Sequence, residues 1–229
     1  MKKFIFTFLL ASIITNVFSQ NTDIKAILLS ELEKLESVKG KYYVYTLTDL
    51  KNASEAIPLL DSRIELTNVI SIPNRKKTEL YDNALKYIGK SYVSAKTVID
   101  VKDKDAGIIV YKPIVTGKYL AKDKLMTYRG TEPLHCTVML EFRDERYKIT
   151  ISNLHTSKGE LLDQEIPFEL FMTESFYDKR PNRDPLNYRG RAHYQNLRTQ
   201  LVLTQLYQLF ALQDEIQDYL SSIESEESW

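Results

Sequence analysis

The sequence is poor in cysteine, glycine and proline. Its 229 residues include one cysteine, Cys136, and seven each of glycine and proline. A single cysteine excludes an internal disulfide, so the folded state must depend on packing. The low glycine and proline counts exclude a collagen-like or low-complexity chain, and the composition is that of a globular protein with one main core.

An excess of charge of one sign is also missing. The chain carries 31 basic and 31 acidic side chains, for a formal net charge of zero. Nucleic acids attract proteins through their phosphates, and a neutral chain has no such overall attraction. The composition therefore predicts no nucleic-acid partner.

Long apolar segments are confined to the N-terminus. Lys2 and Lys3 precede an apolar run over residues 4–14, which is followed by a tail suited to cleavage. This pattern predicts a secretory signal peptide over residues 1–19. The run has about eleven residues where a bilayer span needs roughly twenty, so a membrane anchor is the weaker alternative. We expect an exported mature chain, periplasmic or extracellular, with no transmembrane span.

The residue pattern over positions 20–62 predicts one helix and one strand. Apolar residues recur at helical spacing from Ile24 to Leu35, and Gly40 is a typical residue to end such a helix. The stretch KYYVYTL, residues 41–47, is rich in tyrosine and valine and predicts a strand.

Residues 63–156 predict an α+β core. RIELTNVISIP reads as a strand that Pro73 ends, and Asn74 is expected to cap a helix that runs to about Ser91. Four strands are then predicted, at residues 95–102, 107–115, 134–142 and 145–154. The last two alternate between apolar and polar residues, which indicates an antiparallel hairpin with one packed and one wet face.

The remaining residues predict an irregular segment and a long helix. Three prolines interrupt residues 157–191, whereas residues 192–229 form a helix to about Ile223 and an acidic tail. At 1.5 Å per residue the helix would be roughly 45–50 Å long, which is more than the width of a small sheet. One end is therefore expected to project or to pair with another chain. Its basic start and acidic end suggest antiparallel self-association, or pairing with another envelope protein.

Three motifs follow one another along the predicted core: ELYDNALKYI, then KDAGII, then CTVMLEFRDERYKITISNL. Together they resemble the family called domain of unknown function 4468, described as having a TBP-like fold, over residues 63–155. The resemblance implies a curved antiparallel sheet in β-α-β4-α order, with helices on one face, in an exported bacterial protein. It implies no known activity and supplies no catalytic residues.

The sequence departs from this family's pattern in three places. Tyr87 stands where a tryptophan is expected in the helix, and Glu145 stands where a turn glycine is expected. No second glycine follows Gly107. These departures concern local turns more than the fold.

A TBP-like fold does not by itself predict DNA binding here. The wet face of the hairpin comprises Thr137, Met139, Glu141, Lys148, Thr150 and Ser152. With Lys148 as its single basic side chain, it lacks the set of basic groups needed to bind phosphates, and it lacks the aromatic wedges that open a minor groove.

The stretch VKDKDAGIIVYKP, residues 101–113, first suggests a calcium loop. An EF-hand loop needs oxygen ligands at positions 1, 3 and 5, glycine at 6 and glutamate at 12, and neither the register that starts at Asp100 nor the one that starts at Asp103 supplies them. Aspartate and glycine are also the common residues of tight turns. A hairpin turn is therefore predicted, with calcium binding as the alternative.

No catalytic, metal or cofactor site is predicted. His135 and Cys136 are adjacent on a strand and point to opposite faces, and His155 and His193 lie at the two ends of the irregular segment. Cys136 fits a buried strand position better than the role of a nucleophile. The sequence contains no nucleophile elbow, phosphate loop or dinucleotide fingerprint.

The most suggestive surface segment runs from residue 176 to residue 198. It has six basic and two acidic side chains, a net charge of +4, with tyrosines between them. Arginine beside tyrosine suits anionic ligands and partner surfaces. The candidate ligand-binding residues are Arg183, Tyr188, Arg189 and Arg191. A solvated loop anchored by its tyrosines is the alternative.

Two functions follow from these observations. The first is an exported, non-enzymatic binding or structural module of the cell envelope. The second is a binder or enzyme that acts on an anionic envelope ligand through residues 176–198.

Overall fold

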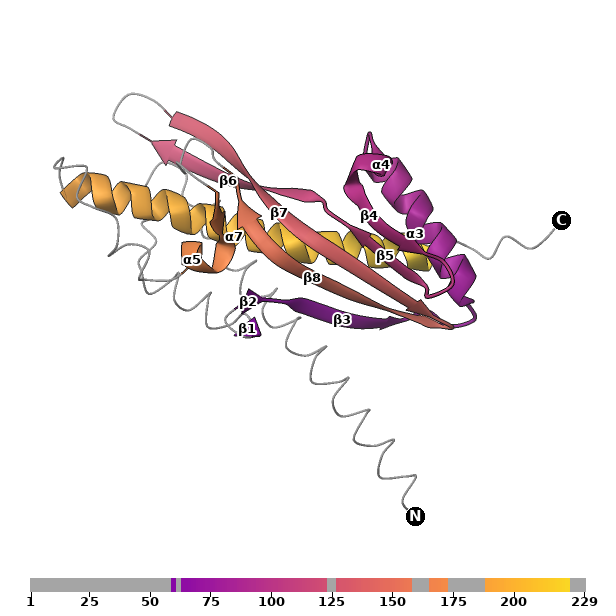
Figure 1. Cartoon of the computed structure of the whole chain (residues 1–229). Coiled ribbons are helices and arrows are strands. Elements are labelled where there is room, and N and C mark those ends of the chain that lie inside the picture. The colour runs from indigo at the N-terminus through magenta and orange to yellow at the C-terminus, as the bar shows by residue number, and fades with distance from the viewer. Residues whose placement is uncertain (1–58, 61–62, 123–126, 158–164, 173–187, 223–229) are drawn as a thin grey trace, which may run out of the picture.

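The computed structural model describes residues 59–60, 63–122, 127–157, 165–172 and 188–222. The predicted signal peptide, the helix that ends near Gly40 and the strand at 41–47 lie outside these residues. The elements are β1 (Leu59–Leu60), β2 (Arg63–Ile64), β3 (Leu66–Ser71), α3 (Lys77–Ser91), α4 (Ala95–Val98), β4 (Ile99–Asp103), β5 (Ile108–Tyr111), β6 (Ile114–Lys122), β7 (Thr127–Arg143), β8 (Arg146–Thr156), β9 (Ile166–Pro167), α5 (Phe168–Met172) and α7 (Tyr188–Ser222) (Figure 1).

One curved, open, antiparallel sheet forms the centre of the fold. Its strand order is β3-β8-β7-β5-β4, with β6 also paired to β7 and β9 to β8. Helices α3 and α7 pack on the same side of this sheet (Figure 1). The predicted α+β, TBP-like class with a long C-terminal helix is confirmed.

The strand count differs from the prediction of four between the helices. The predicted strand at 107–115 is two strands, β5 and β6, which are separated at Lys112 and Pro113. Proline has no N–H to donate to the strand ladder, which explains a break at this position. Strand β6 then continues to Lys122, and with the two-residue β9 the described chain has six strands, β4 to β9, between α3 and α7.

The predicted hairpin of β7 and β8 is confirmed, although β7 begins earlier, at Thr127. Its side chains alternate as expected, since Cys136, Val138, Leu140 and Phe142 are buried and the residues between them are half-buried. The buried side chains of β7, together with those of β3, β5 and β8, form one apolar layer beneath α3 and α7.

Helix α3 ends at Ser91 as predicted but begins later than expected, at Lys77. Asn74 does not cap it: its φ is 62°, and the N-cap residue is Lys76, whose side chain makes no capping bond. Instead, the N–H of Lys77 donates to Asp144 Oδ1 at 2.8 Å. A side chain from the β7–β8 turn thus satisfies the first turn of the helix and ties the two elements together.

The predicted strand at 95–102 is wrong in its first half. Residues 95–98 form the short helix α4, and β4 begins only at Ile99. The hydroxyl and the N–H of Thr97 both donate to the carbonyl of Ser94, at 2.8 and 3.0 Å. These local bonds favour a helical turn over an extended chain.

Helix α7 begins four residues before the predicted start and extends for 35 residues. Its length is about 52 Å at 1.5 Å per residue. Its C-terminal end does not project: Ile216 and Leu220 are buried, and the Tyr219 ring lies 5.4 Å from that of Tyr87 on α3. In the described part of the chain, no helix has both the length and the apolar character needed to cross a bilayer.

The β7–β8 turn provides a test of backbone strain. Glu145, at the expected glycine position, has a φ of 61°, which costs a non-glycine residue about 1–2 kcal/mol. Replacing Glu145 by glycine should remove this strain and lose only the exposed 3.3 Å bond from Asn74 N–H to Glu145 Oε1. We expect the free energy of unfolding in urea to rise by about 0.5–1 kcal/mol. Glu145→Ala loses the same bond but keeps the strain, so a glycine variant no more stable than the alanine variant would contradict the explanation.

Candidate functional site on the open face of the sheet

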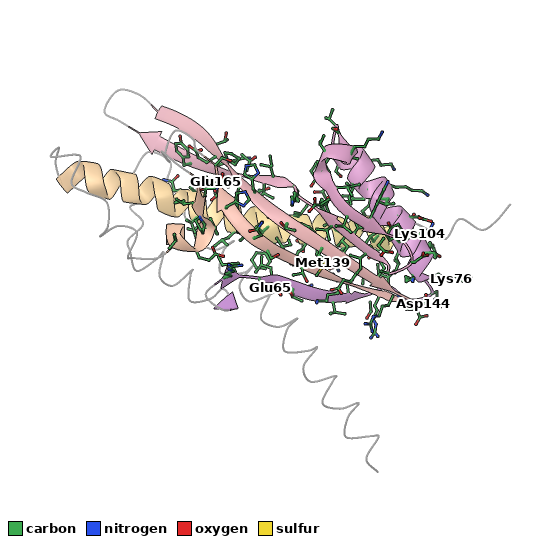
Figure 2. All side chains as sticks on the ribbon, viewed as in Figure 1. Glu65, Lys76, Lys104, Met139, Asp144 and Glu165 are labelled. Atoms are coloured by element: carbon green, nitrogen blue, oxygen red, sulfur yellow. The ribbon has the colours of Figure 1, made fainter. Side chains whose placement is uncertain are left out.

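The side of the sheet that faces away from α3 and α7 is called the open face here. The strand registers place on it Thr67, Val69, Ile108, Val110, Thr137, Met139, Glu141, Lys148, Thr150 and Ser152. Nine of these ten side chains are half-buried, and Thr150 is buried. Figure 2 labels Met139 near the middle of this face. The predicted wet face of the hairpin is therefore the centre of a surface to which four strands, β3, β8, β7 and β5, contribute these residues.

A central row of the open face is free of charge. Cross-strand pairing runs from Thr67 to Thr150, Met139, Val110 and Val101, and so crosses β3, β8, β7, β5 and β4 in turn. The row ends at Val101, which is 46% exposed. Small, hydroxyl-bearing and apolar side chains make this row suited to contact with another protein more than to contact with a polyanion.

The neighbouring row contains a neutralised ion pair. Glu141 and Lys148 are directly opposed on β7 and β8, and Glu141 Oε2 lies 3.0 Å from Lys148 Nζ. Both side chains are partly exposed, so the pair adds little stability. Its main effect is on the charge of the surface. Lys148 is the lysine among the ten residues named above, and the carboxylate of Glu141 neutralises its positive charge.

A β-bulge reverses the orientation of residues at the end of β8. The β7–β8 register shifts between His135 and Thr137, and Asn153 has a φ of 53°. The buried apolar residues of β8 are odd-numbered up to Ile151, whereas the next one, Leu154, is even-numbered. One extra residue in a strand has this effect, and it turns His155 toward the open face.

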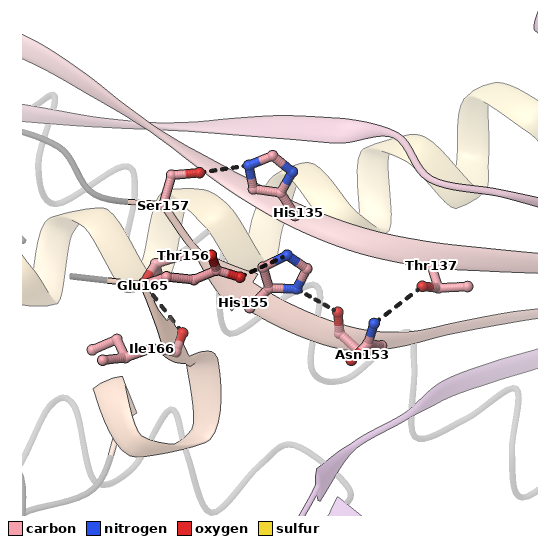
Figure 3. Close-up of polar contacts among 8 residues, drawn as sticks. All are labelled: His135, Thr137, Asn153, His155, Thr156, Ser157, Glu165 and Ile166. Atoms are coloured by element: carbon pink, nitrogen blue, oxygen red, sulfur yellow. Dashed lines mark hydrogen bonds and ion pairs between the residues drawn. The ribbon is translucent and has the colours of Figure 1, made fainter. Parts of the chain in front are cut away.

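The bulge brings His155 directly opposite His135 (Figure 3). The two imidazole rings are stacked, with centroids 5.0 Å apart and planes 9° from parallel. The row continues to Ile114 on β6 and Pro167 on β9. This pairing was not predicted from the sequence, although the shift of the buried apolar positions from odd to even numbers between Ile151 and Leu154 was a signal of the bulge.

Each histidine has its own polar partners. His135 Nε2 and Ser157 Oγ are hydrogen-bonded. His155 Nδ1 lies 3.2 Å from the carbonyl oxygen of Asn153, and its Nε2 lies 3.3 Å from Glu165 Oε1. The Asn153 side chain donates to Thr137 Oγ1 at 3.4 Å, which steadies the bulge. Figure 3 shows these contacts around the pair.

The contacts do not form a Ser-His-acid triad. The serine hydroxyl bonds to His135, whereas the carboxylate lies beside the other histidine. A triad needs the acid on the second nitrogen of the same ring that activates the serine. Burial lowers the pKa of His135, as does the neighbouring His155, while Glu165 opposes the shift.

Cys136 is buried on the opposite side of β7, as predicted. Its thiol lies 3.7 Å from the carbonyl oxygen of Pro113. Burial raises the pKa of this thiol to about 12. Because the thiolate is the nucleophilic form, the structure supports a packing role for Cys136.

The predicted ligand-binding residues are not brought into a described site. Arg183 lies outside the described residues, and Tyr188, Arg189 and Arg191 lie in the first turn of α7, where only the backbone is described. Ligand binding by these four residues stays a prediction. Across the described ranges, no group of three His, Cys, Asp or Glu side chains is already arranged to hold a metal ion.

The stretch that first suggested a calcium loop is a turn between β4 and β5. The N–H of Ala106 donates to Asp103 Oδ1 at 2.8 Å, and Gly107 has a φ of 73°. A Cβ at Gly107 would lie 2.9 Å from the Phe142 carbonyl oxygen, so glycine is also required for space. Lys104 is ion-paired with Asp82 on α3.

Comparison with known proteins supports the resemblance. Residues 67–157 match the family model "Domain of unknown function (DUF4468) with TBP-like fold". A DUF4468 family protein from Bacteroides ovatus ATCC 8483 is similar in structure, with 11% identity and a TM-score of 0.49, over 75% of this chain and 94% of that chain. A TBP-like protein from Parabacteroides distasonis ATCC 8503 has 18% identity and a TM-score of 0.47, over 73% and 98%. No curated protein matches the chain.

Proposed function

We propose that this chain, whose residues 67–157 match the DUF4468 family model, is an exported module of the bacterial cell envelope that binds a protein partner. The binding surface in this proposal is the open face of the sheet. The signal-peptide pattern of residues 1–19 supports export.

The observation that carries the proposal is the uncharged central row of the open face. Met139 lies in the middle of this row, half-buried between Thr150 and Val110. Interface centres in proteins are depleted in charge, and methionine is enriched in them. The compensation of Lys148 by Glu141 supports a protein partner over a nucleic acid.

Helix α7 is the second surface proposed for a partner. Only the side of the helix that is exposed could contact that partner. Its apolar side from Leu201 to Leu220 packs within the chain's own core. Association through α7 would therefore use its exposed side, which includes Asp218 and Ser221. Deleting the helix would remove part of the core, so surface substitutions are the appropriate test.

Binding is tested by co-sedimentation of the purified mature chain with cell envelopes of the producing bacterium. We expect the wild type to sediment with intact envelopes and to stay in solution with protease-treated envelopes. Met139→Arg places a charge in the central row and should lower the bound fraction at least about tenfold, as loss of an interface centre does. Circular dichroism should show that the variant remains folded.

Val93→Arg is the matched control, because Val93 is fully exposed and lies between α3 and α4, outside the strands that form the open face. It introduces the same charge and should bind like the wild type. Equal binding by the wild type, Met139→Arg and Val93→Arg would contradict the proposal that the open face is the binding surface. Export is tested separately by fractionation and N-terminal sequencing, for which a mature start at Gln20 is expected and a cytoplasmic chain that retains Met1 is the contrary result.

A further inference from the structure

We propose that His135, His155 and Glu165 bind one transition-metal ion of the zinc, nickel or copper class at the end of the open face. This inference is independent of the proposed protein partner. It rests on the contacts of His155, on the placement of the two imidazoles by the bulge, and on the distance between His155 and Glu165.

The hydrogen bonding of His155 leaves a position for a cation. The carbonyl oxygen of Asn153 can only accept, so the Nδ1 atom of His155, 3.2 Å away, must donate the ring proton. In the neutral ring, Nε2 then presents a lone pair to the Glu165 carboxylate. Two acceptors that face each other need a positive species between them, either a proton or a metal ion.

The separation of these two acceptors suits a metal ion. His155 Nε2 and Glu165 Oε1 are 3.3 Å apart. A charge-assisted N–H···O bond is usually about 2.7–2.9 Å long. With metal–ligand bonds of about 2.0–2.2 Å, two ligands of a tetrahedral zinc ion lie about 3.4 Å apart.

The surroundings of His155 resemble those of metal-ligating histidines in general. Such a histidine commonly donates its second ring N–H to a backbone carbonyl, which fixes the tautomer and the ring orientation. The Asn153 carbonyl occupies this position, and the backbone conformation of the bulge holds it there. The bulge thus both turns His155 outward and supplies its supporting acceptor.

His135 supplies the third ligand after a side-chain rotation. Directly opposed residues on neighbouring strands have Cβ atoms about 4.5–5.5 Å apart, which is within reach of a shared ion for two imidazoles. In the structure, His135 Nε2 is instead hydrogen-bonded to Ser157 Oγ. This rotation is required because the three groups do not yet form a ready cluster. Imidazole nitrogen with one carboxylate favours zinc, nickel or copper over calcium or magnesium.

The test is calorimetric titration of the metal-stripped, untagged chain with Zn²⁺ and Ni²⁺, and with Ca²⁺ and Mg²⁺ for comparison. We expect one saturable site for Zn²⁺ and for Ni²⁺ and none for the other two ions. His135→Gln and His155→Gln should each weaken binding at least about tenfold, since loss of even an outer-shell partner costs about 10–100-fold. The Glu165 side chain is 66% exposed, so Glu165→Gln tests the carboxylate with little risk to folding.

His193→Gln is the matched control, because His193 is the third histidine of the chain and lies on α7, remote in sequence from the pair. Its affinity should equal that of the wild type. Imidazole ¹⁵N spectra should show Zn²⁺ shifting the Nε2 signals of His135 and His155. The site is refuted if no saturable binding occurs, or if the His135→Gln/His155→Gln double variant binds as tightly as the wild type while melting at the same temperature.

Discussion

Replacing Phe142 by alanine is expected to lower the free energy of unfolding by about 3–5 kcal/mol, the usual cost of removing a buried aromatic ring. Phe142 is 2% exposed at the end of β7. Its ring makes an edge contact with Tyr81 of α3, with centroids 6.0 Å apart, and a tilted contact with Tyr147 of β8 at 5.9 Å. Its removal leaves a cavity where one helix and two strands meet.

Thermal unfolding should report this change as a fall in Tm of roughly 6–20 °C, at about 2–4 °C per kcal/mol for a chain of this size. Phe142→Leu keeps most of the apolar volume and is expected to cost only about 1 kcal/mol. If the alanine and leucine variants were equally stable, the cavity left by the lost apolar volume would not be the cause of the destabilisation.

Replacing Gly117 by valine should lower the free energy of unfolding by about 2–3 kcal/mol through overpacking. Helix α7 lies directly on the backbone of β6, where Thr204 Oγ1 accepts from the N–H of Lys118 at 2.8 Å. A Cβ at Gly117 would lie 2.6 Å from Leu201 Cδ1 and would also overlap Gln205 Cγ. Leu201 and Gln205 are fully buried, so α7 would have to move away from the sheet.

Gly89→Ala is the matched control for this prediction. Gly89 lies inside α3 and is exposed, and a Cβ there would meet nothing within 4 Å. Alanine favours a helix over glycine by about 0.8–1.0 kcal/mol, so this variant should be more stable than the wild type. Urea unfolding of the two variants should give shifts of opposite sign, and a Gly117→Val protein as stable as the wild type would contradict the close packing of α7 on β6.

Period-two alternation was sufficient to predict the β7–β8 hairpin, because each strand has one side against the helices. The apolar pattern wrongly predicted a strand at residues 95–98, which form a helical turn. The local hydrogen bonds between Thr97 and Ser94 that favour this turn depend on polar groups, which the apolar pattern does not include. The sequence-based prediction also assigned capping of α3 to Asn74, whereas the acceptor is Asp144, which is distant in the sequence. Contacts between distant segments are set by tertiary packing and leave no local pattern.

The His135–His155 pair shows how a single inserted residue hid the candidate metal site. Counting along regular strands predicts that residues 151, 153 and 155 share one face. The bulge at Asn153 breaks this count, so Ile151 is buried and His155 faces outward. The break could have been predicted from the position of Leu154, but its partner across the sheet could not, because the register of β7 and β8 is a property of the folded sheet.

The position of α7 in the chain has a consequence for biosynthesis. The side chains from Leu201 to Leu220 complete the apolar layer on which β3, β5, β7 and β8 pack. The ribosome makes the chain from its N-terminus, so these strands emerge before the helix that covers them. The core therefore closes only after residues 201–220 have been synthesised, and until then the nascent sheet residues present an uncovered apolar surface that a chaperone or a translocation machine can hold unfolded.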